Sequence, residues 1–171
     1  MQLPDILQSD LCELNVMARN KEAVLRKIAA IAARADAAKG IAESVIYTRL
    51  LERENQGSTG FGNGIAIPHT RIEGMTGFLL FIVTAPHGID FKALDHKKVQ
   101  LFFILLGPQE QVNEHLKILA SISHLLSDSR IKRELIHAKS KTALYESFVR
   151  NVRTVEHQKS PAVAMKVLYV I

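Results

Sequence analysis

Two nearly continuous apolar runs constrain the fold of this chain more than any other feature. Residues 78–84 read FLLFIVT and residues 99–107 read VQLFFILLG. A strand with one face in solvent alternates apolar and polar residues, whereas a continuous apolar run is typical of a strand covered on both faces. Both runs are shorter than the roughly 20 residues of a membrane-spanning helix. We therefore expect two buried strands, joined by a long connection with turns over residues 85–98, and no transmembrane segment.

Amphipathic helices are expected before these runs. Residues 21–36 carry apolar side chains at helical spacing after Asn20, a suitable N-cap, and residues 41–54 repeat the pattern after Gly40. The segment 57–71, GSTGFGNGIAIPHTR, then places four glycines within eight positions. It predicts a loop that feeds a short strand.

More helices are expected after the second run. Gly107 and Pro108 should end the strand and open a helix, with Pro108 in its first turn and an apolar stripe that extends to Leu126. Residues 129–138 and 141–149 predict two shorter helices. Helices, then strands, then helices indicate an α/β structure in which helices cover a sheet.

Composition favours a single globular domain. The chain has 171 residues, of which 47% are hydrophobic and 23% charged. We expect one domain over residues 1–155 and a C-terminal extension of open role over residues 156–171. From Ser160 this tail is apolar, which fits a packed strand, an oligomer contact or a foreign addition. Residues 1–10 do not resemble a secretory signal, so we expect the chain in the cytoplasm.

The charge distribution and the single cysteine predict neither nucleic-acid binding nor an internal disulfide. The net charge is +5, and residues 129–160 hold eight Lys or Arg against three Glu. No nucleic-acid binding is expected, because aromatic side chains are not interleaved with these charges and no helix-turn-helix or zinc-finger pattern appears. Cys12 cannot form an internal disulfide, and we expect a small buried apolar residue there.

The glycine-rich segment differs from nucleotide-binding motifs. Gly60, Gly62 and Gly64 form G-x-G-x-G, with Ile65 where a dinucleotide-binding loop has its third glycine, and the chain has no P-loop motif. The glycines either let the backbone approach an anion or make sharp turns that aim the next residues. On the first alternative, the candidate binding residues are Ser58, Thr59, Gly62, Asn63 and Gly64.

Two of the seven histidines stand apart from the rest. His69 follows Pro68 at the end of the short apolar strand segment, where a strand terminus meets solvent. His115 shares the inward apolar stripe of its helix, whereas His124, nine residues later, falls on the opposite side. No zinc motif includes these histidines, and no metal site is expected. A core role for His115 remains an alternative, but two imidazoles near a basic side chain and backbone N–H groups suit a phosphoryl group.

Three segments together resemble a known family. The run GSTGFGNGIAIPHTR, the preceding LLERE and the later EHLKILASISHLL resemble the fructose/mannitol-type enzyme IIA (EIIA) family of the bacterial phosphoenolpyruvate-dependent phosphotransferase system, including its nitrogen-regulatory branch. The resemblance extends from about residue 3 to residue 150. It implies a single-domain α/β fold with a mixed β-sheet flanked by helices on both faces. It also implies phosphorylation of His69, with His115 as hydrogen-bond donor and Arg53 as the charge that holds the phosphoryl group.

The resemblance further implies a phosphocarrier without cofactor or metal. The donor is the phosphohistidine of the histidine-containing phosphocarrier protein (HPr), so neither ATP nor a P-loop is required. Two roles stay open: a nitrogen-regulatory protein whose phosphorylation state selects its partners, or a sugar-specific EIIA that passes the phosphoryl group to an EIIB domain. Phe61 and Thr70 differ from the residues usual at these positions in the family. Since neither replaces one of the two histidines, we expect the differences to affect the choice of partner more than the phosphoryl-transfer chemistry. The lack of a fused transport domain and the GNG turn favour the nitrogen-regulatory branch.

Overall fold

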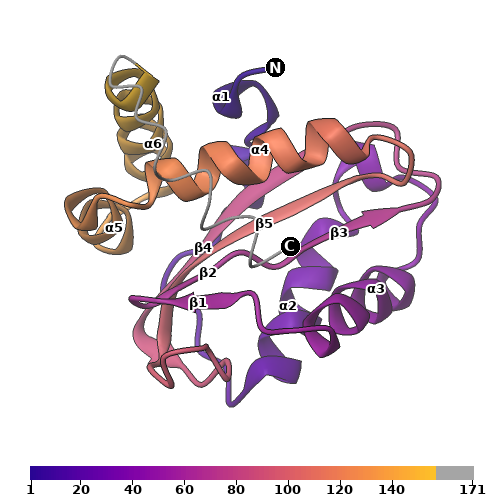
Figure 1. Cartoon of the computed structure of the whole chain (residues 1–171), viewed down its shortest axis with the longest axis horizontal. Coiled ribbons are helices and arrows are strands. Elements are labelled where there is room, and N and C mark those ends of the chain that lie inside the picture. Colours follow the sequence, from indigo (N-terminus) through magenta and orange to yellow (C-terminus); the bar gives the residue numbers. More distant parts are fainter. Residues whose placement is uncertain (157–171) are drawn as a thin grey trace.

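A five-stranded mixed sheet runs through the centre of the protein, as the computed structural model shows for the described residues 1–156 (Figure 1). The long strand β5 pairs antiparallel with β4 along one edge. Along its other edge, β5 pairs in parallel first with β2 and then with β3. The strands are β1 (Gly60–Gly62), β2 (Ile65–Ala66), β3 (His69–Ile72), β4 (Leu79–Ile89) and β5 (Val99–Pro108).

Helices cover both faces of this sheet. The Phe103 ring packs against Phe148 of α6 at 6.0 Å between centroids, whereas Phe102 packs against Phe91 at 5.3 Å. Because neighbouring residues on a strand point to opposite faces, these contacts mark the two sides of β5. The ammonium group of Lys21, on α2, lies over the Phe91 ring. The predicted fold class is confirmed, with helices α2 (Lys21–Ala32), α3 (Glu43–Asn55), α4 (Val112–Leu125), α5 (Ser129–Ile136) and α6 (Lys141–Glu156).

The N-terminal segment adds structure that the sequence did not predict. A short helix α1 (Leu3–Ile6) and a 3-10 turn η1 (Ser9–Leu11) precede a stretch that lies along β4. Gln8 and Glu13 donate backbone hydrogen bonds to β4 carbonyls at 2.8 and 3.1 Å. Cys12 is buried there, as predicted, and burial raises the pKa of its thiol to about 11. The segment therefore completes the cover of the outer edge of the sheet.

The predicted position of Pro108 is wrong. Pro108 does not open a helix, because it is the last residue of β5 and pairs with Ile72 of β3, and α4 begins only at Val112. A proline lacks the N–H of a ladder hydrogen bond, which a strand tolerates at its end. Between strand and helix, the Gln111 N–H donates to the Pro108 carbonyl in a turn.

Three element ends also differ clearly from the sequence prediction. The helix expected to end at residue 36 ends at Ala32, before a 3-10 turn η2 (Asp36–Ala38), and the last helix extends from residue 149 to Glu156. Strand β4 continues beyond residue 84 to Ile89, so the connection to β5 is shorter than expected. A shift of pairing register after Thr84 accommodates Pro86 within this strand.

Among residues 1–156, no helix combines the length and the hydropathy that crossing a bilayer requires. The prediction for the apolar tail from Ser160 concerns residues outside those that the structure describes.

Candidate functional site

The glycine-rich segment forms a tight hairpin between β1 and β2. Asn63 and Gly64 both have positive φ, at 59° and 77°, and connect the paired residues Gly62 and Ile65. A two-residue loop with this geometry is a type I′ turn, for which Asn-Gly is the preferred sequence. The Gly64 carbonyl then accepts hydrogen bonds from the N–H groups of residues 100 and 101 on β5. Of the two interpretations of these glycines, the structure supports the sharp turn that aims the next residues.

His69 is the first residue of β3. The chain breaks its pairing with β5 at residues 67–68 and resumes it at His69, opposite Leu105. The His69 side chain is only 4% exposed, so the expectation of a solvent-facing strand terminus is wrong. Its ring lies against the face of the sheet that α4 covers, 5.8 Å from the ring of His115.

The contacts of His69 define its tautomer. Nδ1 lies 2.6 Å from the Ile67 carbonyl oxygen, and the Nε of Arg53 donates a hydrogen bond of 3.2 Å to Nε2. Since an arginine N–H only donates, Nε2 carries the lone pair and Nδ1 carries the proton. Burial lowers the pKa of His69 to about 3; the Ile67 carbonyl opposes this shift, and the nearby Arg53 and His115 reinforce it. His69 is therefore neutral and presents a nucleophilic Nε2.

Arg53 is held in place by the end of its own helix. It lies in the last turn of α3, and its Nη1 donates to the Gly57 carbonyl at 2.8 Å. Burial lowers the pKa of the guanidinium, and the adjacent Glu54 opposes that shift. The Glu54 carboxylate is itself buried, accepts the Thr59 N–H at 2.7 Å and pairs with Lys21 at 3.3 Å. This buried carboxylate fixes the turn that positions Arg53.

His115 lies on the first turn of α4, facing the sheet. Its ring is 4% exposed and packs between His69 and Phe78, whose ring centroid is 6.1 Å away. A Cβ on Gly107 would lie 2.4 Å from the Phe78 ring and 3.3 Å from Nδ1 of His115, so this position requires glycine. Burial and the positive charge of Arg71 lower the pKa of His115 to about 4. His115 is therefore neutral as well.

The two imidazoles favour opposite tautomers. Nδ1 of His115 is buried without a hydrogen-bond partner among the described residues. A buried N–H without an acceptor is rarer than a bare acceptor, which favours the tautomer with the proton on Nε2. His69 thus offers a lone pair, whereas His115 offers an N–H donor.

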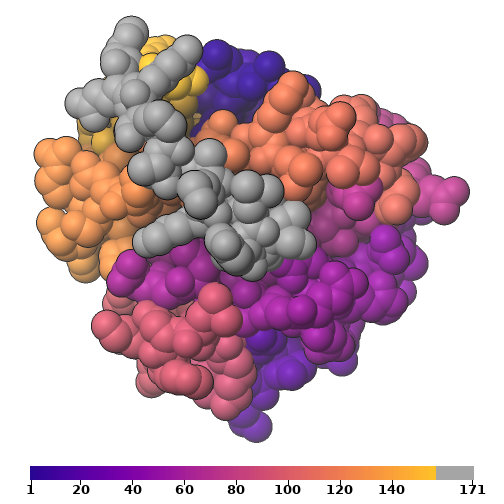
Figure 2. Space-filling view, viewed as in Figure 1, coloured from indigo at the N-terminus to yellow at the C-terminus, as the bar shows by residue number. Residues whose placement is uncertain are grey.

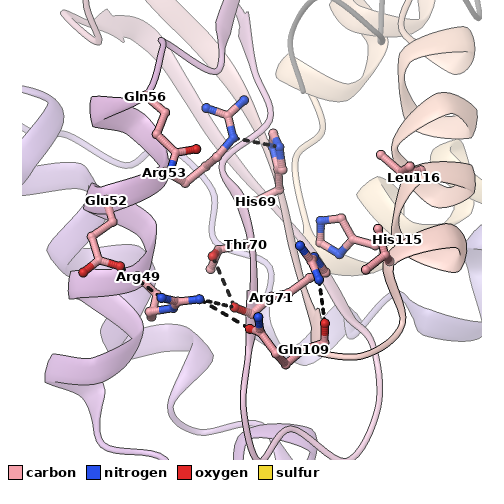
Figure 3. Close-up of a pocket in the computed structure, with 11 residues that line it drawn as sticks. Arg49, Glu52, Arg53, Gln56, His69, Thr70, Arg71, Gln109, His115 and Leu116 are labelled. Atoms are coloured by element: carbon pink, nitrogen blue, oxygen red, sulfur yellow. Dashed lines mark hydrogen bonds and ion pairs between the residues drawn. The ribbon is translucent and has the colours of Figure 1, made fainter.

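A cavity of about 320 Å³ joins these groups between α3, β3 and α4 (Figure 3). The surface view shows the orange α4 segment and the purple α3 segment exposed on this side of the molecule (Figure 2). Glu52 is the only acidic residue in the described lining, and it pairs with Arg49 at 3.2 Å. The cavity therefore suits an anion, and its lining residues are Arg49, Glu52, Arg53, Gln56, His69, Thr70, Arg71, Gln109, Val112, His115 and Leu116.

Comparison with known proteins identifies the family. Residues 5–151 match the family model described as "Phosphoenolpyruvate-dependent sugar phosphotransferase system, EIIA 2". The chain belongs to this EIIA family. The resemblance drawn from the three sequence segments is thereby confirmed.

Several EIIA relatives are nitrogen regulatory proteins. The nitrogen regulatory protein of Pseudomonas aeruginosa is 36% identical over 149 residues, which cover 87% of this chain and 96% of that protein. A fructose-specific EIIABC component of Bacillus subtilis is 29% identical, over 85% of this chain and 23% of its own length. The crystal structure of nitrogen regulatory protein IIA-Ntr from Neisseria meningitidis superposes with a TM-score of 0.78 at 26% identity, over 85% and 97% of the two chains.

The EIIA pocket brings together only part of the residues that the sequence suggested. His69, His115 and Arg53 all line it. The five loop candidates, Ser58, Thr59, Gly62, Asn63 and Gly64, do not; they lie in the turn after α3 and in the hairpin. The Thr59 N–H and hydroxyl donate to Glu54, and the Asn63 N–H donates to Asp95.

Sequence reasoning missed several polar residues of the EIIA pocket, among them Arg49, Arg71 and Gln109. Arg49 lies one helical turn before Arg53, and Arg71 lies two positions after His69 on the same strand. Helical and strand periodicity would have placed each beside its neighbour. Gln109 lies in the irregular connection after β5, where no periodic pattern indicates the direction of a side chain.

Proposed function

We propose that this EIIA-family protein accepts a phosphoryl group on Nε2 of His69 from the phosphohistidine of an HPr-type phosphocarrier, in a nitrogen-regulatory role. One observation carries the proposal: a neutral imidazole directs its lone pair into a cavity lined by three arginines. A neutral imidazole is a competent nucleophile, and the guanidinium groups suit the charge of a phosphoryl group.

The transfer step balances without a further reactant. The Nε2 lone pair of His69 attacks phosphorus, and the bond between phosphorus and the donor imidazole breaks. The donor ring keeps that electron pair and leaves as a neutral imidazole when its other nitrogen is protonated. His69 becomes a phosphorylated imidazolium, whose Nδ1–H keeps its hydrogen bond to the Ile67 carbonyl. The phosphoryl group comes from a protein, so the step uses no ATP.

Two neighbours assist this step. The Nε of Arg53 already donates a hydrogen bond to Nε2 of His69 at 3.2 Å. Once the new bond to phosphorus forms, the guanidinium can donate to the phosphoryl oxygens instead. Its planar guanidinium can donate two parallel hydrogen bonds to such oxygens. His115 donates its Nε2–H to the phosphoryl group, which is the role that preorganised donors have in phosphoryl transfer.

The second candidate function is a sugar-specific EIIA that passes the phosphoryl group to an EIIB domain. The fructose-specific EIIABC relative from Bacillus subtilis favours it. Greater identity to the nitrogen regulatory protein of Pseudomonas aeruginosa favours the regulatory role. Affinity capture with the phosphorylated and unphosphorylated protein, beside a transfer assay to candidate EIIB domains, distinguishes the two. Rapid transfer to an EIIB domain supports sugar uptake, whereas partners that depend on phosphorylation state support regulation.

Phosphorylation itself is tested by labelling. Phosphoenolpyruvate, enzyme I and HPr should label the protein once, and mass mapping should place an acid-labile phosphate on His69. His69→Ala should abolish labelling, because the nucleophile is gone. The control His137→Ala changes an exposed histidine outside the pocket and should label like the parent. A phosphate mapped to His124 or His137, or full labelling of His69→Ala, would contradict the proposal.

A further inference from the structure

We propose that Arg71 is a second phosphoryl-binding arginine of the pocket, acting together with Arg53. The inference rests on the proposed function, since it assigns a further residue to the same phosphorylated site. Arg71 comes from the sheet, whereas Arg53 comes from helix α3, so the two guanidinium groups enter the pocket from different elements (Figure 3).

The strand places Arg71 on the same face as His69. The two residues are separated by two positions on β3, about 7 Å along a strand, which an arginine side chain can span. They pair with Leu105 and Gly107 of β5, respectively. A Cβ on Gly107 would lie 3.3 Å from Nδ1 of His115, which shows that this face of the sheet lies against α4. Arg71 therefore points into the space that both histidines line.

The guanidinium of Arg71 is anchored while most of its donors remain available. Its Nη1 donates to the Gln109 carbonyl at 2.5 Å, which uses one of the five N–H groups of an arginine. Within residues 1–156, Arg71 makes no ion pair with a carboxylate. Arg49 differs, because its guanidinium pairs with Glu52 at 3.2 Å. Arg71 thus offers an anchored positive charge that the described carboxylates do not compensate.

The charge of Arg71 also acts on the pocket before phosphorylation. It lies close enough to His115 to oppose protonation of that ring, as burial does more strongly. The same electrostatic field attracts a dianionic phosphoryl group placed between the rings. Arg71 therefore adds to the effect of burial in keeping His115 neutral, and its charge favours the phosphorylated state.

The test compares Arg71→Gln and Arg71→Lys with two phosphoryl donors. One donor is phosphorylated HPr, and the other is phosphoramidate, a small molecule that needs no protein docking. Arg71→Gln should accept the phosphoryl group about 10- to 100-fold more slowly from both donors, because a hydrogen bond to a charged group is lost. Arg71→Lys should recover part of the rate, since it keeps the charge without the planar geometry.

A spectroscopic readout separates binding of the phosphoryl group from a loss of fold. In ³¹P spectra, the phosphoryl group on His69 should titrate at higher pH in Arg71→Gln than in the parent, because a neighbouring positive charge is gone. Arg34→Gln is the matched control: it removes one exposed arginine that pairs with Glu13 at 3.5 Å, and it should behave like the parent.

The two donors distinguish failure of the role of Arg71 from failure of the proposed function. Equal rates within about two-fold and an equal ³¹P titration for Arg71→Gln and the parent overturn the role of Arg71 but leave phosphorylation of His69 intact. A parent that accepts phosphoramidate on His69 but not the phosphoryl group of HPr contradicts the proposed function, while the phosphoramidate rates still decide the role of Arg71. A parent labelled by neither donor overturns both. If Arg71→Gln does not fold, the rate and ³¹P titration of Arg71→Lys decide.

Discussion

Helix α4 carries one histidine near each end, and the two ends lie in different surroundings. His115, near the N-terminal end, is 4% exposed and lines the pocket with three arginines. His124, near the C-terminal end, is half-buried in a separate groove between α1, α4 and α6. That groove includes the Glu156 carboxylate and no arginine or lysine among its described lining residues. The same residue type on the same helix thus lies beside three arginines at one position, whereas at the other it lies in a groove lined by Glu156 and the N-terminal residue Met1.

This difference shows that positive charge is concentrated at the N-terminal end of α4. The N-terminus of a helix carries a partial positive charge and its C-terminus a partial negative charge. Arg53 and Arg71 add to the positive end, whereas the described lining of the groove at the negative end has no arginine or lysine, and Glu156 and the Met1 N-terminus there have opposite charges. A phosphoryl dianion is therefore favoured beside His115 over a position beside His124. Helical periodicity separates the two histidines, but only their neighbours give them different chemistry.

The largest expected effect contrasts His115→Ala with His124→Ala. Removing the His115 donor should slow labelling by HPr about 10- to 150-fold, which corresponds to about 1.5 to 3 kcal/mol for a hydrogen bond to a charged group. His124→Ala should label at the parent rate. Thermal melting of both variants measures whether the fold survives.

The opposite result would restore the simpler interpretation of His115. If His115→Ala labels like the parent but melts at a much lower temperature, the residue is a core histidine and the two-histidine site is wrong. If His124→Ala slows labelling equally, the two ends of α4 do not differ in the way that we infer.

A second prediction concerns pH. His69 and His115 have pKa values of about 3 and about 4 in the folded protein, below their ordinary value of 6.5. Between about pH 6.5 and pH 4 the unfolded chain binds protons on both rings and the folded protein does not, so unfolding takes up protons. The free energy of unfolding should therefore fall as the pH falls through this window, by about 2 kcal/mol for each histidine at pH 5.

Urea unfolding at pH 7 and pH 5 measures this effect. His69→Gln should lose about 2 kcal/mol less than the parent between the two pH values, because one of the two proton-binding groups is gone. His124→Gln, measured in the same way, shows how much the histidine at the other end of α4 contributes to the change in the free energy of unfolding between the two pH values. Equal losses for His69→Gln and the parent would mean that His69 is protonated as readily in the folded protein as in the unfolded chain.

The smallest expected effect is that of Arg53→Lys. A lysine keeps the positive charge but cannot donate to Nε2 of His69 and to the Gly57 carbonyl in the fixed geometry of the guanidinium. We expect labelling about ten-fold slower, with little change in thermal stability. Initial rates at saturating phosphorylated HPr give the comparison. Unchanged kinetics and stability would reduce Arg53 to an ordinary charge at a helix end.

Much of the fold followed from local patterns. The apolar runs predicted β4 and β5, because a strand covered on both faces has no polar alternation to preserve. Helical spacing predicted the helices α2 to α6. The predicted ends of α2 and α6 were wrong, because the last turn of a helix depends on tertiary contacts that a local pattern does not contain. The position of Pro108 was wrong because a proline after a strand fits both a strand end and a first helical turn. Pairing with Ile72 of β3 decides between them, and that pairing joins residues far apart in the sequence.

The sequence by itself proposed the three central residues of the candidate site. The segment around His69, the arginine near the end of α3 and the inward position of His115 were all evident before the fold. The tertiary structure decided what those residues can do. The lone pair of His69 lies on Nε2 because Ile67 and Arg53 occupy its two nitrogens, and burial keeps the ring neutral. The structure shows that the hairpin glycines form a sharp turn outside the pocket. It also shows that Arg71, which sequence reasoning missed, lines the pocket. Charge, burial and hydrogen bonding depend on neighbours that only folding brings together.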